Sequence, residues 1–255
     1  MPPASAPSDR VTEAPSPAAA PVPARLVVAI DGPSGAGKST VARKLAQKLG
    51  AAYLDTGAMY RAVTVQVLAD GRDLDDPEAI AGVLDRVEVE PGLDPKHPTI
   101  RLNDRDVSTE VRSAPVTQAV SAVSAVPAVR AALVQVQRAA IDGAPAIVVE
   151  GRDIGTVVAP DATVKVFLTA AADARAQRRN LELRSSAETP SLHGTAHDLA
   201  RRDALDSGRQ ISPLARAADA VEIDTTAMTA AEAVEEIVRL VRDRVGDTPE
   251  RAAKP

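Results

Sequence analysis

The chain has 255 residues, enough for one sizeable α/β domain with an appended subdomain. Its formal charge of −5 argues against a long nucleic acid as partner, because such a partner calls for an extended basic face. Zero cysteines exclude disulfides and thiolate metal sites. Of the three histidines, His193 and His197 stand four residues apart but have no third ligand nearby, so we expect no zinc site.

The two ends of the chain have the composition of disordered tails. Residues 1–24 are rich in Pro, Ala and Ser, and they lack both the apolar core of a signal peptide and the basic face of a transit peptide. Residues 246–255 are similar in composition. No stretch approaches the ~18 consecutive apolar residues of a membrane span. We therefore expect a soluble, cytoplasmic monomer that is folded over residues 25–245.

A phosphate-binding pattern opens the folded part of the chain. An apolar run at residues 26–30 predicts a buried strand, and apolar residues recur at helical spacing over residues 41–49. Between them, G-x-x-x-x-G-K-[ST] lets backbone N–H groups surround α and β phosphates, while Lys38 reaches the β and γ phosphates and Ser39 reaches Mg²⁺. ATPase, GTPase and kinase all remain open on this pattern. The predicted ATP-binding residues are Gly32, Pro33, Ser34, Gly35, Ala36, Gly37, Lys38, Ser39 and Thr40.

Strands and helices alternate after this loop, which predicts a doubly wound, five-stranded parallel sheet of α/β class. The further strands are expected at residues 51–54, 146–149, 164–168 and 221–223. A helix is expected at residues 57–69, with Asp55 or Thr56 as its N-cap. Thr229 and Glu232 have the spacing of a capping box, which predicts a last helix to about residue 245.

Two segments interrupt the alternation. Residues 73–142 predict a small mixed α/β insertion, with strands at 87–90 and 99–103 and a helical stretch at 116–141 that Pro127 breaks in two. Residues 170–214 are dense in arginine and predict two helices joined by a loop at 185–194. Both segments are candidates for parts that bind or cover a ligand.

Other motifs narrow the reaction class. A GTPase would need Asn-Lys-x-Asp to select guanine, and the chain has no such motif. Glu150, after an apolar strand, is the nearest match to the acidic group of a motor ATPase, where it would position water or a metal. The Gly151-Arg152-Asp153 turn that follows instead places an arginine and a carboxylate at the crevice where such sheets bind ligands. A kinase is the favoured interpretation, and an ATPase stays open.

Four segments together resemble bacterial cytidylate kinases. They are GPSGAGKST, LDTGAMYR at 54–61, VEGRDIGTVVAPDATVKVFL at 149–168 and RRDALDSGRQISPL at 201–214. The resemblance implies a nucleoside-monophosphate kinase fold in which the insertion binds the monophosphate and the arginine-rich segment is a lid. It also implies transfer of the γ-phosphoryl of ATP to CMP or dCMP, with Mg²⁺. A kinase for another monophosphate or a small metabolite is the alternative within this fold.

The same resemblance implies individual roles. Three residues would bind the acceptor phosphate, which two guanidiniums can hold in fork geometry. Three would bind the base, where Arg donates to O2 and N3 of cytosine and the carboxylate and hydroxyl accept from N4. Three would contact ribose and phosphate at the lid edge. The residues for the acceptor phosphate are Thr56, Arg61 and Arg152. Those for the base are Ser121, Arg130 and Asp153, and those at the lid edge are Arg202, Asp206 and Arg209.

The arginine-rich segment also supplies candidates for contacts with ATP. Arg175, Arg178 and Arg179 could reach its phosphates or adenine, with Arg175 assigned to the nucleotide. An ordinary helix ion pair between Arg202 and Asp206 remains an alternative to their ligand roles. The groups expected to stabilise the transferring phosphoryl are Lys38, Arg152, Arg178 and Arg209.

Overall fold

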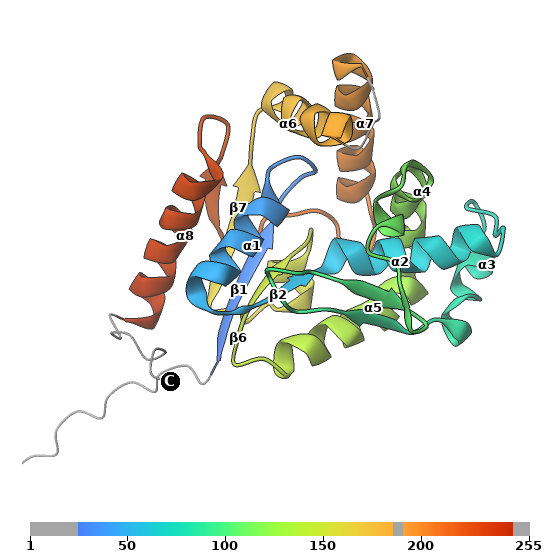
Figure 1. Cartoon of the computed structure of the whole chain (residues 1–255), viewed down its shortest axis with the longest axis horizontal. Coiled ribbons are helices and arrows are strands. Elements are labelled where there is room, and N and C mark those ends of the chain that lie inside the picture. Colours follow the sequence, from blue (N-terminus) through green and yellow to red (C-terminus); the bar gives the residue numbers. More distant parts are fainter. Residues whose placement is uncertain (1–24, 186–190, 247–255) are drawn as a thin grey trace, which may run out of the picture.

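A five-stranded parallel sheet forms the centre of the molecule (Figure 1). The computed structural model describes residues 25–185 and 191–246. The strand order is β2-β6-β1-β7-β8, and every neighbouring pair is parallel. This confirms the predicted fold class. The strands are β1 (Leu26–Asp31), β2 (Ala52–Asp55), β6 (Ala146–Glu150), β7 (Val164–Thr169) and β8 (Val221–Asp224).

Each of these strands ends one residue later than its apolar pattern predicts. The additional residue is polar in every case and lies at the carboxyl edge of the sheet, where ligands of open α/β sheets bind. The ladder continues through these residues, since Glu150 is paired with both Ile30 and Asp55 in register. The five polar strand ends are Asp31, Asp55, Glu150, Thr169 and Asp224.

Aliphatic side chains alternate along β1 and fill a core on each side of the sheet. Val28 and Ile30 face α1 (Lys38–Leu49) and α8 (Ala230–Val245). Val27 and Ala29 face the opposite cluster, which includes α2 (Thr56–Ala69), α4 (Ala114–Ala125) and α5 (Pro127–Asp142). Helices thus cover both faces of the sheet. Side chains on both faces of each strand are therefore apolar, which explains the continuous apolar runs that predicted the strands.

The predicted helix boundaries hold for local chemical reasons. Asp55 caps α2 by accepting a hydrogen bond from the Ala58 N–H at 2.9 Å. Pro127 starts α5, and α4 and α5 meet at an angle of 96°. Thr229 and Glu232 form the capping box at the start of α8, with both reciprocal bonds present.

The insertion contains a small antiparallel sheet, as predicted, with more elements than the sequence indicated. Its strands are β3 (Val89–Pro91), β4 (Ile100–Leu102) and β5 (Arg105–Asp106), in that order. The Asn103-Asp104 turn between β4 and β5 has positive φ at both residues, as is typical of a two-residue hairpin turn. Not predicted were β5, the short helices α3 (Pro77–Ala81), η1 (Leu84–Arg86) and η2 (Glu110–Arg112), and the π-helix η3 (Ile154–Val158).

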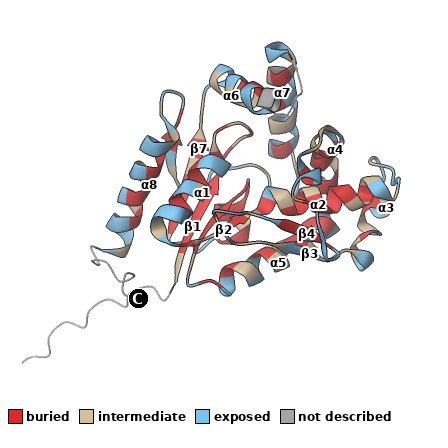
Figure 2. Cartoon of the chain, viewed as in Figure 1, coloured by how far each residue is buried: buried red, intermediate tan, exposed pale blue. Residues whose placement is uncertain are grey.

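Two helices project beyond the carboxyl ends of the strands (Figure 1). They are α6 (Ala172–Ser185) and α7 (Leu192–Ser207), as predicted for the arginine-rich segment. Figure 2 shows that most of their described residues are exposed or intermediate, whereas the central strands β1, β6 and β7 are mostly buried. Of the loop expected at residues 185–194, residues 186–190 lie outside the described residues. Its other residues differ from the prediction, because Ser185 ends α6, Ser191 is the N-cap of α7 and residues 192–194 form the first turn of that helix. The predicted tails also lie outside the described residues, apart from Gly246.

Within the described ranges, no single helix is long and apolar enough to cross a membrane. The bent pair α4 and α5 meets that test only when the two helices are taken together.

Candidate active site

The loop between β1 and α1 has the backbone of an anion-binding site. Gly32 has a φ of +147°, and a Cβ there would lie 2.1 Å from the backbone oxygen of Leu168. No side chain caps the start of α1, so its first N–H groups are available to an anion. The Lys38 ammonium donates to the Pro33 carbonyl at 2.9 Å across the loop. The predicted phosphate loop is therefore formed.

A cavity of about 500 Å³ opens beside this loop, at the carboxyl ends of β2 and β6. Nine cationic and five acidic side chains line it, although the chain as a whole is acidic. The positive charge of the protein is thus concentrated where a polyanion would sit. The cationic lining residues are Lys38, Arg43, Arg61, Arg112, Arg130, Arg152, Arg179, Arg202 and Arg209.

The cations of the cavity destabilise one another. Burial, and then Arg152, lower the pKa of Lys38 to about 7. Burial, and then Arg202, lower the pKa of Arg61 to about 9. The same two causes, with Arg152 as the neighbour, lower the pKa of Arg202 to about 10. A bound anion would relieve both the burial cost and the mutual repulsion, so the arrangement is suited to phosphate groups.

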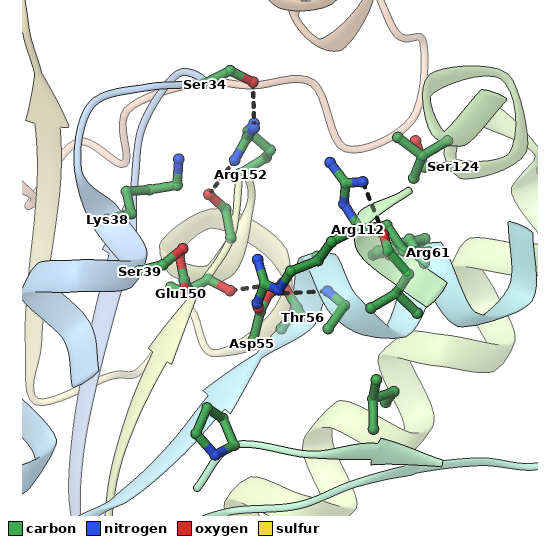
Figure 3. Close-up of a pocket in the computed structure, with 18 of the residues that line it drawn as sticks. Ser34, Lys38, Ser39, Asp55, Thr56, Arg61, Arg112, Ser124, Glu150 and Arg152 are labelled. Atoms are coloured by element: carbon green, nitrogen blue, oxygen red, sulfur yellow. Dashed lines mark hydrogen bonds and ion pairs between the residues drawn. The ribbon is translucent and has the colours of Figure 1, made fainter. Parts of the chain in front are cut away.

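Arg152 joins the loop to α7. It follows the carboxyl end of β6, and its Nη2 donates to Ser34 Oγ at 2.8 Å (Figure 3). Its Nε donates to Asp206 Oδ2 at 2.9 Å. Asp206 also pairs with Arg209. The acidic partner of this cluster is therefore shared between Arg152 and Arg209, and the alternative of an Arg202–Asp206 helix ion pair is not among the ion pairs of the described residues.

Arg61 and Thr56 stand on α2, on the side of the cavity that faces the insertion. Arg61 Nη1 donates to Thr117 Oγ1 at 2.8 Å and to the Val111 carbonyl at 3.1 Å. Thr56 Oγ1 donates to the Glu150 carbonyl at 2.7 Å. Both side chains line the same cavity as the phosphate loop (Figure 3). The structure thus brings together the three residues predicted for an acceptor phosphate, Thr56, Arg61 and Arg152.

The residues predicted for the base form a buried group deeper in the cavity. Arg130 and Asp153 make an ion pair with both side chains almost fully buried. Arg130 Nη1 also donates to the Ser124 carbonyl at 3.1 Å, and its guanidinium lies 5.2 Å from the centre of the Tyr60 ring. Ser121 is buried and lines the same cavity.

The predicted arginines of α6 divide into different positions. Arg175 Nη1 donates to the Ser34 carbonyl at 3.0 Å and pairs with Asp203, behind the loop. Arg178 donates to Thr225 Oγ1 at 3.0 Å, beyond the end of β8, and does not line the cavity. Arg179 does line it. The structure therefore does not bring Arg178 to the other cations that were expected to stabilise a transferring group.

Three polar residues that the sequence did not single out as a group converge below the loop. Ser39 Oγ donates to Glu150 Oε2 at 2.9 Å, and the buried Tyr53 hydroxyl donates to Glu150 Oε1. Burial, and then Asp55, raise the pKa of Glu150 to about 7. Tyr53 occupies a position in an apolar run, so its sequence context indicates a core residue only.

Another unpredicted carboxylate fixes the turn that carries Arg152 and Asp153. Asp31, at the end of β1, accepts from the backbone N–H groups of Ile154 at 2.8 Å and Gly155 at 2.7 Å. These are the first residues of η3. Asp31 therefore connects the strand before the phosphate loop directly to the element that follows Arg152.

The oxygen atoms near the loop are the kind that Mg²⁺ prefers. Ser39 and Glu150 both line the cavity and touch each other. Mg²⁺ in phosphoryl-transfer sites is held by one or two such groups together with substrate phosphates and water. The described residues hold no group of three or more His, Cys, Asp or Glu that could bind a metal alone.

Comparison with known proteins decides the family. A family model described as cytidylate kinase matches residues 28–243. The chain belongs to the cytidylate kinase family. It is 50% identical over 227 residues to the cytidylate kinase of Streptomyces coelicolor, covering 89% of this chain and 96% of that one. It is 52% identical over 220 residues to that of Nocardia farcinica, covering 86% and 95%.

Likeness to solved structures is weaker. A shikimate kinase from Acinetobacter baumannii, in complex with shikimate, has a TM-score of 0.40 and 15% identity, covering 86% of this chain and 94% of that one.

Proposed function

We propose that the chain transfers the γ-phosphoryl group of ATP to CMP or dCMP, giving ADP and the cytidine diphosphate. The proposal rests on the family and on one contact. Arg152, the predicted ligand of the acceptor phosphate, donates to Ser34 within the phosphate loop. A donor on the loop and an acceptor on Arg152 would therefore have their phosphates side by side in one cavity.

The residues support transfer by positioning and charge. The attacking oxygen belongs to a phosphate that is already ionised, so no strong general base is required. The developing charge on the migrating group would be stabilised by Lys38, Arg152 and Arg209. Ser39 and Glu150 would hold Mg²⁺, whose positive charge stabilises the β and γ phosphate oxygens when it is bound.

The deep end of the cavity supports cytosine over uracil. Asp153 pairs with Arg130 through Oδ2, which leaves Oδ1 to accept from the N4 amino group of cytosine. Uracil presents the O4 oxygen there and would face the carboxylate unfavourably. Arg130 has further N–H groups for O2 and N3, because its hydrogen bonds to Ser124 and Asp153 use only two of its five N–H donors.

Asp206 supports a ribose contact at the edge of the cavity. Both of its oxygens already accept from arginines, Oδ2 from Arg152 and Oδ1 from Arg209. Each carboxylate oxygen can accept a second bond, so a sugar hydroxyl can be added without breaking the cluster. Closure of α6 and α7 over bound nucleotides would then exclude water from the γ-phosphate. We expect the protein to act as a cytoplasmic monomer.

A substrate panel tests the assignment. ADP formation from ATP and Mg²⁺ is measured by a coupled assay with CMP, dCMP, UMP, AMP or GMP as acceptor. We expect rapid turnover with CMP or dCMP and at least ~100-fold lower kcat/KM with UMP. The reason is that placing the O4 oxygen of uracil against the buried carboxylate of Asp153 costs several kcal/mol. Equal use of UMP would refute the role of Asp153. ADP formation that is independent of any acceptor would support the ATPase alternative.

A further inference from the structure

One buried polar group close to the base pocket has no role in the proposed reaction. Gln137, on α5, is 1% exposed, and neither its amide oxygen nor its amide nitrogen has a hydrogen-bond partner. Burying an amide without partners costs free energy, so a purely structural glutamine here would be worse than methionine or leucine. The residue requires another explanation, and its neighbours supply one.

The hydroxyl of Tyr60 is a polar neighbour of Gln137. Tyr60 is a buried residue of α2 that lines the cavity, and its hydroxyl also has no partner in hydrogen-bond geometry. Burial raises the pKa of Tyr60, and a contact with the Gln137 amide acts in the opposite direction, so the two groups adjoin. Gln137 does not itself line the cavity. It lies one layer behind the cavity wall, against the phenol end of Tyr60.

The ring of Tyr60 in turn supports Arg130. The guanidinium of Arg130 lies 5.2 Å from the ring centre, and its Nε, like the groups behind it, is buried without a partner. Arg130 and Gln137 are seven residues apart on α5, which places them on the same face of the helix. Gln137, Tyr60 and Arg130 thus form a stack from the core to the base pocket.

We propose that Gln137 is a positioning residue that determines base specificity, because it fixes the orientation of the Tyr60 ring on which Arg130 rests. The proposal depends on the proposed function, since Arg130 is there the donor to O2 and N3 of cytosine. When the acceptor binds, a small rotation of the phenol brings its hydroxyl into hydrogen-bond geometry with the Gln137 amide. Arg130 is then held in the plane of the base, and binding of the acceptor, not of ATP, depends on Gln137.

The decisive variant is Gln137→Met, which keeps the length of the side chain and removes its polar atoms. Because the amide has no hydrogen-bond partner in the structure, we expect the melting temperature of the variant to be unchanged or higher. We expect the KM for CMP to rise ~5-fold, the value of about one hydrogen bond, while kcat and the KM for ATP stay within ~2-fold. The preference for CMP over UMP should fall by a similar factor.

Two further variants separate positioning from packing. Tyr60→Phe removes the hydroxyl that Gln137 contacts, so the double variant should resemble either single variant instead of multiplying their effects. Gln135→Met is the matched control, since Gln135 is exposed on the same helix, and it should behave as the parent protein. A KM for CMP in Gln137→Met equal to that of the parent would overturn the proposal. Multiplicative effects in the double variant, or an equal rise in the KM for ATP, would also overturn it.

The parent protein separates this inference from the proposed function. If the parent phosphorylates CMP and Gln137→Met leaves the KM for CMP unchanged, only the inference is overturned. If the parent does not phosphorylate CMP, the proposed function and the inference are both overturned.

Discussion

At the scale of single residues, Arg152 is the side chain at which the two ends of the cavity meet. It contacts Ser34 of the loop and Asp206 of α7, and it neighbours Lys38 closely enough to lower the pKa of that residue. Its charge is therefore available to both phosphates of a transfer. The loop itself is held by glycine conformations and by β7, so it does not depend on Arg152 to bind ATP.

Replacing Arg152 with alanine tests whether Arg152 is needed for phosphoryl transfer but not for ATP binding. We expect kcat for CMP to fall ~10²- to 10³-fold, as for loss of other preorganised donors, while the Kd of ATP changes by no more than ~3-fold. Steady-state kinetics and calorimetric titration with ATP measure the two quantities. Arg239→Ala is the control, because Arg239 is an exposed arginine of α8 that does not line the cavity. Unchanged CMP kinetics in Arg152→Ala would contradict the site assignment.

Glu150 predicts a pH dependence of stability. Its pKa is raised to about 7 in the folded protein from a usual value of 4.5, so the folded state holds a proton that the unfolded state has lost between those values. The free energy of unfolding must then fall as pH rises through this window, by at most ~1.4 kcal/mol per pH unit. Asp31, with a pKa raised to about 6 by burial, acts in the same direction.

Thermal unfolding of the ligand-free protein at pH 5 and pH 6.5 measures this effect. We expect a lower melting temperature at pH 6.5, and a smaller difference in Glu150→Gln, whose amide can bond to Tyr53 and Ser39 without titrating. Lys38 is charged in both states over most of this window, so it contributes little to the slope. An identical slope in the parent and in Glu150→Gln would show that Glu150 does not titrate abnormally.

Site residues were predictable from the sequence only where a local pattern carried them. The phosphate loop and the Gly151-Arg152-Asp153 turn have such patterns. Tyr53 does not, because it stands in an apolar run that indicates a core residue only. Gln137 does not, because a glutamine between Val136 and Arg138 on a helix is typical of an exposed position. Arg178 and Arg179 differ by one position and therefore by about 100° around a helix. Only the packing of α6 decides which of them reaches the cavity.

At the scale of elements, the phosphate loop depends on close packing against β7. A Cβ at Gly32 would lie 2.1 Å from the Leu168 oxygen, a backbone atom that cannot move away without shifting the strand. Gly32→Ala should therefore lower the free energy of unfolding by ~2 kcal/mol or more and abolish tight ATP binding.

Thermal unfolding with and without ATP measures both effects of Gly32→Ala. Gly143→Ala is the matched control, since Gly143 has a φ of −77° and a Cβ there would make only ordinary contacts. Normal stability and ATP binding in Gly32→Ala would show that the loop is not held as described.

The fold was more predictable than the site because its signals are local and repeated. Apolar runs marked all five parallel strands, and Pro127 and the capping box marked helix boundaries. The one-residue extension of each strand was not predictable, because a polar residue at a strand end carries no periodic signal. The π-helix η3 was missed for another reason. Its first N–H groups bond to Asp31, more than 120 residues earlier, so a tertiary contact stabilises it.

At the scale of the whole molecule, charge and packing are distributed unequally. The chain is acidic, yet cations outnumber carboxylates around the cavity. The two core clusters flank the sheet, whereas α6 and α7 bury few described side chains and carry Arg179, Arg202 and Asp206 to the cavity. A rigid sheet with a thinly packed helical pair above it is suited to closure over two phosphorylated ligands.

The central claim is that donor and acceptor phosphates occupy one cavity at the same time. A single molecule that joins cytidine and adenosine through five phosphates tests it most directly. We expect one molecule to bind per chain, more tightly than either CMP or ATP alone, and to inhibit competitively against both substrates. Competition with ATP alone, or a requirement for two molecules per chain, would contradict the account.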